Sequence, residues 1–233
     1  MPLESLTIFF PMYNEAGNIE KVIASVETVV PHLNVPKLEI MLIDDGSRDG
    51  CDKTVEAWAA RNPAVRLVRH PRNMGYGAAL RTGFLEAKSD AVFYTDSDLP
   101  VDLFDLQRAL PLLETADLVI GYRILRHETF RRAVFSRVYN LLMRFMFGVR
   151  VRDVNFSFKL VHRRVLDCIK LDASTVFIDG QILAEARRCG FKIAELAIEY
   201  TPRKVGRSNF DSFRTAWNTF TEMAAYWRRR PSA

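Results

Sequence analysis

The sequence predicts an α/β fold, an open and mostly parallel sheet with helices on both faces. Three observations predict it. Short, nearly continuous apolar runs recur along the chain, as expected for strands buried on both faces of a sheet. Segments with helical periodicity separate these runs, which is the pattern of strand–helix–strand crossover units. The length of 233 residues suits one domain with a sizeable hydrophobic core.

The first half of the chain supplies the regular part of this alternation. The expected strands are Leu6–Phe10, Leu38–Asp44, Val65–Arg69, Ala91–Thr95 and Leu118–Gly121. The expected helices are Ala16–Val30, Cys51–Arg61, Gly75–Lys88 and Val101–Glu114. Ligands of open α/β sheets bind outside the carboxyl ends of the strands, so the residues that follow each strand are the first candidates for a site.

The second half is less regular but continues the pattern. The expected strands are Phe156–Val161 and Lys192–Tyr200, and the expected helices are Arg131–Val149, Phe177–Cys189 and Phe210–Arg228. We found no internal repeat and no low-complexity segment. The simplest partition is therefore a single domain, 1–233, with a first half of 1–122 and a second half of 123–233.

Composition and charge bound the class of protein. The chain is 48% hydrophobic and 26% charged, which is ordinary for a globular domain and excludes gross disorder. The net charge of +5 favours an anionic partner without selecting among nucleotides, lipid head groups and nucleic acids. Cys51, Cys168 and Cys189 have neither the pattern of a disulfide framework nor zinc-ligand spacing, so we expect a reducing compartment.

The sequence contains no recognisable membrane-inserting segment. Its start lacks the features of a secretory signal peptide, and no uncharged run reaches the roughly 18–20 residues of a spanning helix. We therefore expect any membrane contact to be peripheral.

Two pairs of carboxylates follow expected strands. Asp44 and Asp45 end the Leu38–Asp44 run and precede Gly46 and Ser47, which indicates a tight turn. One interpretation is a ligand site at the strand end. The alternative is an Asx-type turn, with Asp49 capping the helix that begins near Cys51.

Asp96 and Asp98 follow the Ala91–Thr95 run. If this segment stays extended, residues two apart point the same way, so the two carboxylates project together while Ser97 turns aside. Such a pair suits Mg²⁺ or Mn²⁺, which takes one or two protein carboxylates and completes its shell with phosphate oxygens and water. The alternative is a solvated turn before the next helix. Two acidic strand ends on one sheet edge favour the metal–nucleotide site.

Gly75 and Gly77 open a helix after the Val65–Arg69 strand. Main-chain N–H groups at such a helix start can approach a phosphate. Close packing of the helix on the sheet explains small residues equally well. The dinucleotide-binding fingerprint is incomplete, because Leu80 occupies the place of its third glycine.

Five segments, taken in order, resemble the family 2 glycosyltransferases, and more narrowly their dolichyl- or polyprenyl-phosphate hexosyltransferase branch. They read FPMYNEAGNI, LIDDGSRDG, RNMGYGAALRTGF, TDSDLP and PRKVGRS. Two further stretches, GYRILRHETFRRAVFSRVYN and RDVNFSFKLVHR, are similar to that branch as well. The resemblance covers nearly the whole chain and implies a GT-A fold and an inverting displacement.

By match to the family's motifs, each half receives a role. The first half would bind the nucleotide sugar and the second half the acceptor. The nucleotide-sugar candidates are Pro11, Tyr13, Glu15, Asp44, Asp45, Asp96, Arg123 and Arg207. The metal candidates are Asp96 and Asp98, and the catalytic candidates are Asp98, Asp179 and Arg203. Bond cleavage leaves negative charge on the nucleotide diphosphate, and Mg²⁺ or Mn²⁺ and positioned arginines would stabilise that charge.

Asp179 stands where many family members have an acid that faces the acceptor. Transfer to an alcohol requires a base, whereas a phosphate acceptor is already anionic and could attack unaided. Asp179 would then orient the acceptor or a cation. A further alternative is that Asp179 only caps a Gly180–Cys189 helix.

The resemblance implies transfer of a hexose, of mannose or glucose type, from a GDP- or UDP-sugar to a polyprenyl- or dolichyl-phosphate-like lipid. Two alternatives stay open, a family member with a saccharide or other non-phosphate acceptor and a non-catalytic membrane-recruited scaffold. A dinucleotide-dependent oxidoreductase is disfavoured by the incomplete glycine fingerprint, and a sugar nucleotidyltransferase by the missing glycine-rich basic loop. The charge pattern matches no nucleic-acid-binding motif.

Two amphipathic helices suggest where the protein works. Val134–Val149 has a narrow polar stripe, with Arg137 and Arg144 on it, and is otherwise apolar. The terminal helix has an apolar face followed by a basic cluster at its end, and that face comprises Phe213, Trp217, Phe220, Ala224 and Trp227. Such helices can lie in a membrane interface. They can equally pack on the domain, on a second copy or on a membrane-protein partner. The expected location is cytoplasmic, at the cytoplasmic face of the membrane.

Overall fold

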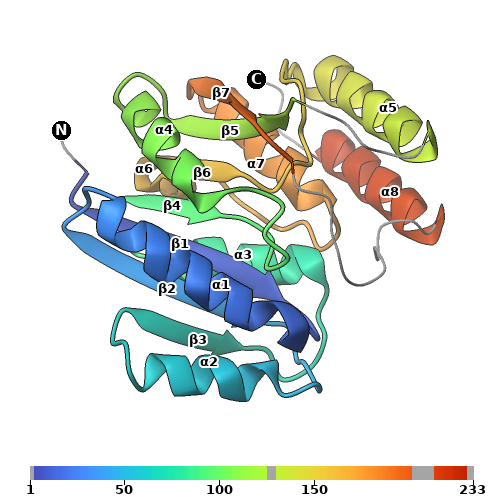
Figure 1. The fold of residues 1–233 in the computed structure, drawn as a ribbon. Helices are drawn as coiled ribbons and strands as arrows, with labels where there is room; N and C mark the ends of the chain where they lie inside the picture. Colours follow the sequence, from blue (N-terminus) through green and yellow to red (C-terminus); the bar gives the residue numbers. More distant parts are fainter. Residues whose placement is uncertain (1–2, 125–129, 201–212, 230–233) are drawn as a thin grey trace.

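The computed structural model describes residues 3–124, 130–200 and 213–229. Within these ranges the strands form one seven-stranded sheet in the order β3-β2-β1-β4-β6-β5-β7 (Figure 1). The strands are β1 (Ser5–Met12), β2 (Lys37–Asp44), β3 (Val65–Arg69), β4 (Ala91–Tyr94), β5 (Leu118–Arg123), β6 (Lys159–His162) and β7 (Ile193–Ile198). All neighbouring pairs are parallel except those of β6, which runs antiparallel to β4 and β5.

Helices cover both faces of the sheet, as the sequence predicts. The α-helices are α1 (Ala16–Val29), α2 (Cys51–Ala59), α3 (Tyr76–Glu86), α4 (Leu106–Ala109), α5 (Phe130–Phe147), α6 (Arg163–Cys168), α7 (Phe177–Arg188) and α8 (Phe213–Arg229). One hydrophobic core packs α1, α2 and α4 on the sheet, and a second core packs α3, α5, α6, α7 and α8 on the opposite face. Strand β1 shows the period of two, because Ile8 and Phe10 enter one core and Phe9 the other.

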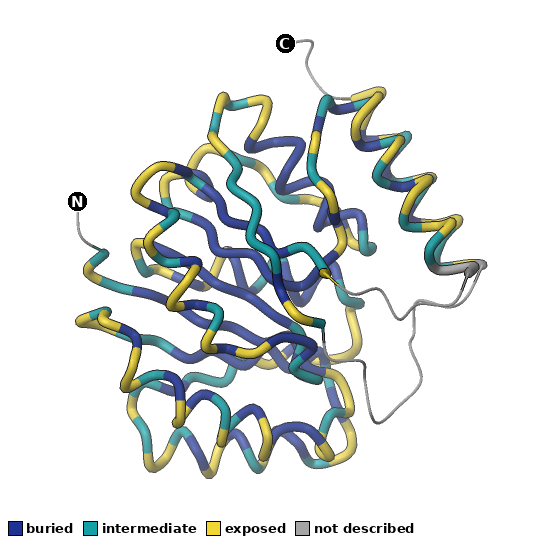
Figure 2. The backbone as a smooth tube through the Cα atoms, turned by 45° about the horizontal axis from the view of Figure 1, so that its top comes forward, coloured by how far each residue is buried: buried dark blue, intermediate teal, exposed yellow. Residues whose placement is uncertain are grey.

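Burial follows the layers of the fold. The central strands are buried along most of their length, and the exposed residues lie on the outer faces of the helices (Figure 2). The buried strands explain why the apolar runs of the sequence predict the sheet well.

The expected helix Val101–Glu114 is wrong. The segment is a 3₁₀ turn (Leu103–Asp105), the short helix α4 and a second 3₁₀ turn (Leu110–Glu114). Pro111 explains the break, because proline has no N–H to donate and disfavours the α conformation in the residue before it. The sequence reading also missed α6, and it began the strand that became β6 at Phe156, three residues before its observed start at Lys159.

The carboxyl ends of β1, β2 and β4 meet at one edge of the sheet. Tight turns follow there. Asn14 and Leu99 adopt positive φ angles of 55° and 49°, a conformation that non-glycine residues rarely take. Gly46 has φ 75°, and a Cβ there would lie 2.5 Å from the main-chain carbon of Arg72. The loops of this edge therefore pass very close to one another.

Candidate active site

A cavity of about 370 Å³ lies at this edge of the sheet. Its wall comes from the ends of β1 and β4, the loops before α3 and α7, and helix α8. The lining residues are Pro11, Met12, Tyr13, Glu15, Asp45, Asn73, Gly75, Tyr76, Ala79, Asp96, Ser97, Asp98, Ser174, Thr175, Val176, Thr215 and Asn218.

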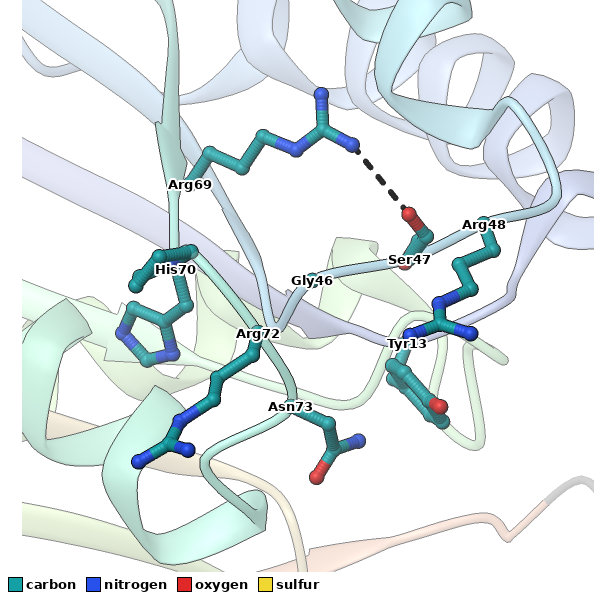
Figure 3. A pocket seen from close by; sticks show the side chains of 9 residues that line it. Tyr13, Gly46, Ser47, Arg48, Arg69, His70, Arg72 and Asn73 are labelled. Atoms are coloured by element: carbon teal, nitrogen blue, oxygen red, sulfur yellow. Dashed lines mark hydrogen bonds between the residues drawn. The ribbon is translucent and has the colours of Figure 1, made fainter.

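A second cavity, of about 470 Å³, adjoins the first and shares Tyr13 and Asn73 with it. Figure 3 shows its wall, where Arg48, Arg69 and Arg72 contribute three basic side chains. Arg69 also donates a hydrogen bond to the main-chain oxygen of Ser47, at 3.3 Å. The two cavities together offer acidic side chains at one end and basic side chains at the other.

Asp96 and Asp98 both line the first cavity. The segment does not stay extended. Strand β4 ends at Tyr94, and the main-chain oxygen of Asp96 accepts a hydrogen bond from the Leu99 N–H, at 3.1 Å, in a turn. Burial raises the pKa of Asp96 from its ordinary 3.8 to about 7, and the charge of Asp98 adds to the increase. A carboxylate whose ionisation is opposed by burial and by a neighbouring carboxylate is a fitting place for a divalent cation.

The rest of a cation's shell would have to come from elsewhere. Within the described ranges, no group of three or more His, Cys, Asp or Glu side chains is arranged to hold a metal ion. Mg²⁺ and Mn²⁺ can bind with only one or two protein carboxylates, since oxygens of a substrate phosphate and water complete their coordination.

Asp44 and Asp45 have different positions. Asp44 is fully buried, accepts a hydrogen bond from the Ser47 N–H at 2.8 Å, and lies 3.1 Å from Arg69 Nε. It closes an Asx-type turn and does not line either cavity. Its expected contact with the nucleotide stays a prediction.

Asp45 lines the first cavity and holds the loop before α3. Its carboxylate accepts hydrogen bonds from the N–H groups of Met74 and Gly75, both at 2.8 Å, and lies 2.7 Å from His70 Nδ1. The N–H of Gly75 is thus bound to a carboxylate. At Gly77 the close neighbour is the loop before α7 and not the sheet, because a Cβ there would lie 2.4 Å from the main-chain carbon of Ser174.

The end of β1 contributes Pro11, Tyr13 and Glu15 to the cavity wall, and their contact with the nucleotide sugar stays a prediction. Glu15 accepts a hydrogen bond from the Asn18 amide at 2.5 Å. Asp49 accepts from the N–H groups of both Ala16 and Cys51, at 2.8 and 3.2 Å, so it caps two helix starts instead of the expected one.

Asp179 does not line the cavity. Its side chain is 1% exposed, accepts a hydrogen bond from Lys159 Nζ at 2.7 Å, and accepts another from the Tyr94 hydroxyl. The expected cap of a Gly180–Cys189 helix is wrong, because α7 begins at Phe177 and Asp179 lies within its first turn. Its catalytic role stays a prediction.

Arg123 is also bound within the protein. It makes a two-pronged ion pair with Asp153, at 2.7 and 3.1 Å, and its guanidinium lies 5.5 and 5.4 Å from the ring centres of Phe156 and Tyr200. It is not among the residues of either cavity wall. Its expected phosphate contact stays a prediction, and Arg203 and Arg207 lie outside the described residues.

The family model for "Glycosyl transferase family 2" matches residues 7–170. This chain belongs to glycosyl transferase family 2. The resemblance that the five sequence segments indicate is thereby confirmed, and the enzyme class is that of a glycosyltransferase.

Named relatives of this family 2 glycosyltransferase include polyprenyl-phosphate sugar transferases. Polyprenol monophosphomannose synthase of Mycolicibacterium smegmatis is 29% identical over 222 residues, covering 89% of this chain and 81% of that protein. Undecaprenyl-phosphate mannosyltransferase of Micrococcus luteus is 28% identical, covering 87% and 86%. Glycosyltransferase AglD of Haloferax volcanii is 27% identical over 95% of this chain, which spans only 37% of that relative's length.

The fold has solved counterparts. Glucosyl-3-phosphoglycerate synthase of Mycobacterium tuberculosis superposes with a TM-score of 0.77 over 98% of this chain and 82% of that one, at 19% identity. A mixed sheet with helices on both sides is common to both, so the GT-A fold expected for this glycosyltransferase is confirmed. The same synthase was also solved with Mn²⁺, UDP and glucosyl-3-phosphoglycerate.

The sequence reading missed several residues of this glycosyltransferase's cavity. Tyr76 lies between Gly75 and Gly77, which the sequence marks as a possible phosphate-binding helix start. This position was the signal that could have identified Tyr76 as a cavity residue. Ser174 and Thr175 gave no signal, because their place in the wall depends on α8. There Glu222 accepts four hydrogen bonds, from the N–H and the hydroxyl of each residue, at 2.5–3.0 Å.

Proposed function

We propose that this chain transfers a hexose from a nucleoside-diphosphate sugar to a polyprenyl-phosphate-type lipid, with Mg²⁺ or Mn²⁺ as cofactor. The observation that supports it most is the pair Asp96 and Asp98 on the wall of one cavity at the carboxyl edge of the sheet. Relatives named as polyprenol and undecaprenyl phosphate transferases favour the acceptor class, and the Mn²⁺- and UDP-bound synthase favours the donor class.

Asp96 and Asp98 would hold the divalent cation. A cation bound there would offset the charge that develops on the leaving nucleotide diphosphate. The chain's own contribution is to keep both carboxylates partly withdrawn from water, where their interaction with a cation is stronger than in bulk solvent. Asp45 contributes indirectly, by fixing the loop before α3, which forms part of the cavity wall.

The nucleoside would lie between the two cavities. Tyr13, which is 38% exposed, is shared by both and offers an aromatic ring beside Asn73. Arg48 and Arg72 would face anionic groups of the donor from the second cavity. In this arrangement residues 1–122 bind the donor, and residues 123–233 bind the acceptor.

The acidic groups of the wall favour a phosphate acceptor. The carboxylates among the lining residues are Glu15, Asp45, Asp96 and Asp98. Glu15 and Asp45 accept hydrogen bonds from the protein, and Asp96 and Asp98 are assigned to the cation. We therefore assign none of these four as the base that an alcohol acceptor would need. A phosphate acceptor needs none, since it is already anionic at neutral pH.

Helices α5 and α8 would bring the enzyme to the cytoplasmic face of a membrane. They lie side by side, with the rings of Phe135 and Phe220 stacked at 6.3 Å (Figure 1). The two helices expose large apolar residues, namely Val134, Phe135, Val138, Leu141, Phe145, Trp217 and Trp227. Among the described residues, no helix is long and apolar enough to cross a bilayer. Exposed arginines, such as Arg137 and Arg144, accompany the apolar surface and would meet anionic head groups.

Donor cleavage and transfer test the proposal. Purified protein is assayed for nucleotide release from UDP- and GDP-hexoses, with and without polyprenyl phosphate and Mn²⁺. We expect release that depends on both additions, is lost in Asp98→Asn, and is retained in the control Asp167→Asn, whose carboxylate is an exposed partner of Arg163. Release that is stimulated by a saccharide but not by the lipid phosphate would overturn the acceptor assignment. Release that persists in Asp98→Asn would overturn the site.

Membrane contact is tested separately. We expect sedimentation with vesicles of anionic phospholipid, weakened when Phe145 and Trp217 are replaced by serine. A protein that ignores vesicles but dimerises through the same residues would instead assign this surface to a second copy.

A further inference from the structure

A chain of buried polar side chains runs from the cavity wall into the core. The Tyr76 hydroxyl donates a hydrogen bond to Asp96 Oδ1 at 3.2 Å and lies beside the Tyr94 hydroxyl. Tyr94 in turn donates to Asp179 Oδ1, which accepts a second hydrogen bond from Lys159 Nζ at 2.7 Å. One end of this network is thus a candidate metal ligand, and the other end is an ion pair that no water reaches.

The fold brings these residues together from four elements. Antiparallel pairing places Lys159 of β6 directly opposite Tyr94 of β4. Tyr76 is the first residue of α3, and Asp179 lies in the first turn of α7. Tyr94 and Lys159 are fully buried, and Asp179 is 1% exposed. The ion pair therefore lies buried between β6 and the first turn of α7, where solvent cannot supply an alternative partner.

The contacts of Lys159 fix its charge and its direction. Its Nζ donates to Asp179 Oδ1, to the Phe156 main-chain oxygen at 2.8 Å and to the Tyr94 oxygen at 3.4 Å. These three contacts use all three N–H donors of an ammonium group. The positive charge balances the carboxylate of Asp179, so the pair is neutral as a unit.

The hydrogen bonds are ordered in one direction. The Tyr94 hydroxyl donates its hydrogen bond to Asp179, so it presents only oxygen lone pairs to Tyr76 and Lys159. The Tyr76 hydroxyl has one proton, and it donates that proton to the hydrogen bond with Asp96. A tyrosine hydroxyl is protonated at neutral pH, because its ordinary pKa is about 10, so both hydroxyls keep the protons that this order requires.

We propose that Lys159, Asp179 and Tyr94 are positioning residues that act through the Tyr76 hydroxyl to fix the orientation of the Asp96 carboxylate toward a bound cation. Ligating carboxylates are commonly held by such outer hydrogen bonds, whose loss weakens metal binding about 10–100-fold. The assignment gives Asp179 a role behind the cavity wall instead of that of a base facing the acceptor. It rests on the proposed function, because it needs a cation at Asp96 and Asp98.

Binding of Mn²⁺ tests the network without any turnover. Free Mn²⁺ is measured by electron paramagnetic resonance during titration of the protein alone, with UDP and with GDP. We expect Tyr76→Phe and Tyr94→Phe to raise the dissociation constant of Mn²⁺ about tenfold or more. The matched control is Tyr139→Phe, which removes another buried tyrosine hydroxyl in the same core that makes no hydrogen bond within the described residues. Its dissociation constant should stay within about twofold of that of the wild type.

A second pair of variants separates positioning from stability. Lys159→Met leaves the Asp179 carboxylate buried without its cation, whereas the double variant Lys159→Met/Asp179→Leu removes both charges. Replacing a whole buried ion pair by apolar residues commonly restores stability. We expect the double variant to regain the wild-type melting temperature while its affinity for Mn²⁺ stays reduced, because Tyr94 has lost its acceptor.

The outcomes are distinct. Full recovery of Mn²⁺ affinity in the double variant, or equal affinities of Tyr76→Phe, Tyr94→Phe and Tyr139→Phe, would show that the network only stabilises the fold. A wild-type protein that binds no Mn²⁺ in any of the three titrations would instead overturn the proposed function, and this inference with it.

Discussion

The two halves of the molecule place their charged residues in different ways. In the first half, Glu15, Asp45, Asp96 and Asp98 all lie on the wall of one cavity. In the second half, Arg123 and Asp179 are paired with Asp153 and Lys159 and lie off that wall. Residues that follow parallel strands are brought to one edge by the topology, whereas the position of a charge elsewhere depends on the partner it finds.

This contrast predicts that charge substitutions in the second half have their largest effect on stability, and those in the first half on turnover. The largest effect is expected at Lys159→Met. Removing one member of a buried ion pair typically costs about 3–5 kcal/mol, because the remaining charge is uncompensated. Equilibrium denaturation by urea measures the loss. An unfolding free energy equal to that of the wild type would contradict the buried pair.

Asp96→Asn tests the same contrast in the first half of the molecule. We expect kcat to fall roughly 10²–10³-fold, which corresponds to about 2.7–4 kcal/mol of lost transition-state stabilisation. The metal-free protein should be no less stable than the wild type, because the substitution removes a carboxylate that repels Asp98. Steady-state kinetics with saturating Mn²⁺ and a thermal melt in EDTA provide the two measurements.

The same carboxylate predicts a pH dependence. The folded-state pKa of Asp96 is raised from 3.8 to about 7, so between these pH values the folded protein binds more protons than the unfolded chain. The stability of the metal-free protein should therefore fall as pH rises from about 4 to about 7, by about 2–4 kcal/mol from this group. Denaturation of wild type and Asp96→Asn in EDTA at pH 5 and pH 8 isolates the contribution. An equal change in both proteins would refute it.

Arg123→Lys tests the second half at a smaller scale. Lysine keeps the charge but loses the planar two-pronged contact with Asp153, so we expect about 1–2 kcal/mol of lost stability and an unchanged KM for the donor. The sequence-based expectation that Arg123 binds phosphate predicts the opposite, a raised KM with unchanged stability. Measuring both quantities on one preparation decides between them.

The smallest effect on the fold is expected at the outer side of α8. Trp217 is 60% exposed, so Trp217→Ser should change the unfolding free energy by no more than about 0.5 kcal/mol. Vesicle binding should weaken several-fold, because an exposed aromatic ring contributes much of the apolar contact with a bilayer surface. Unchanged vesicle binding would argue that another surface faces the lipid.

The sequence predicted the sheet and the acidic edge because both depend on local patterns. An apolar run of strand length can be recognised from its own residues. The residues that follow it lie at the carboxyl edge of the sheet because the strands are parallel. Pro111 is the local signal in the sequence for the break in the fourth expected helix. The antiparallel direction of β6 could not be inferred, since it depends on pairing with β4 and β5.

The remainder of the site depends on distant pairs that no local pattern announces. Asp179 and Lys159 are 20 residues apart and meet where the first turn of α7 packs against the start of β6. Ser174 reaches the wall because Glu222, 48 residues later, holds it there. Motif matching gave the correct family, but it could not tell an acid that lines a cavity from one that lies behind it.

Glu222 has a practical consequence for anyone who reads kinetic data on this enzyme. Its single carboxylate anchors both the rim at Ser174 and Thr175 and the helix that supplies Thr215 and Asn218, yet it does not itself line the cavity. A substitution at this position will change the outline that a substrate meets and will mimic the loss of a contact residue in rate measurements. Only a ligand-bound structure of the variant would reveal that the substituted residue lies behind the cavity wall and does not contact the substrate.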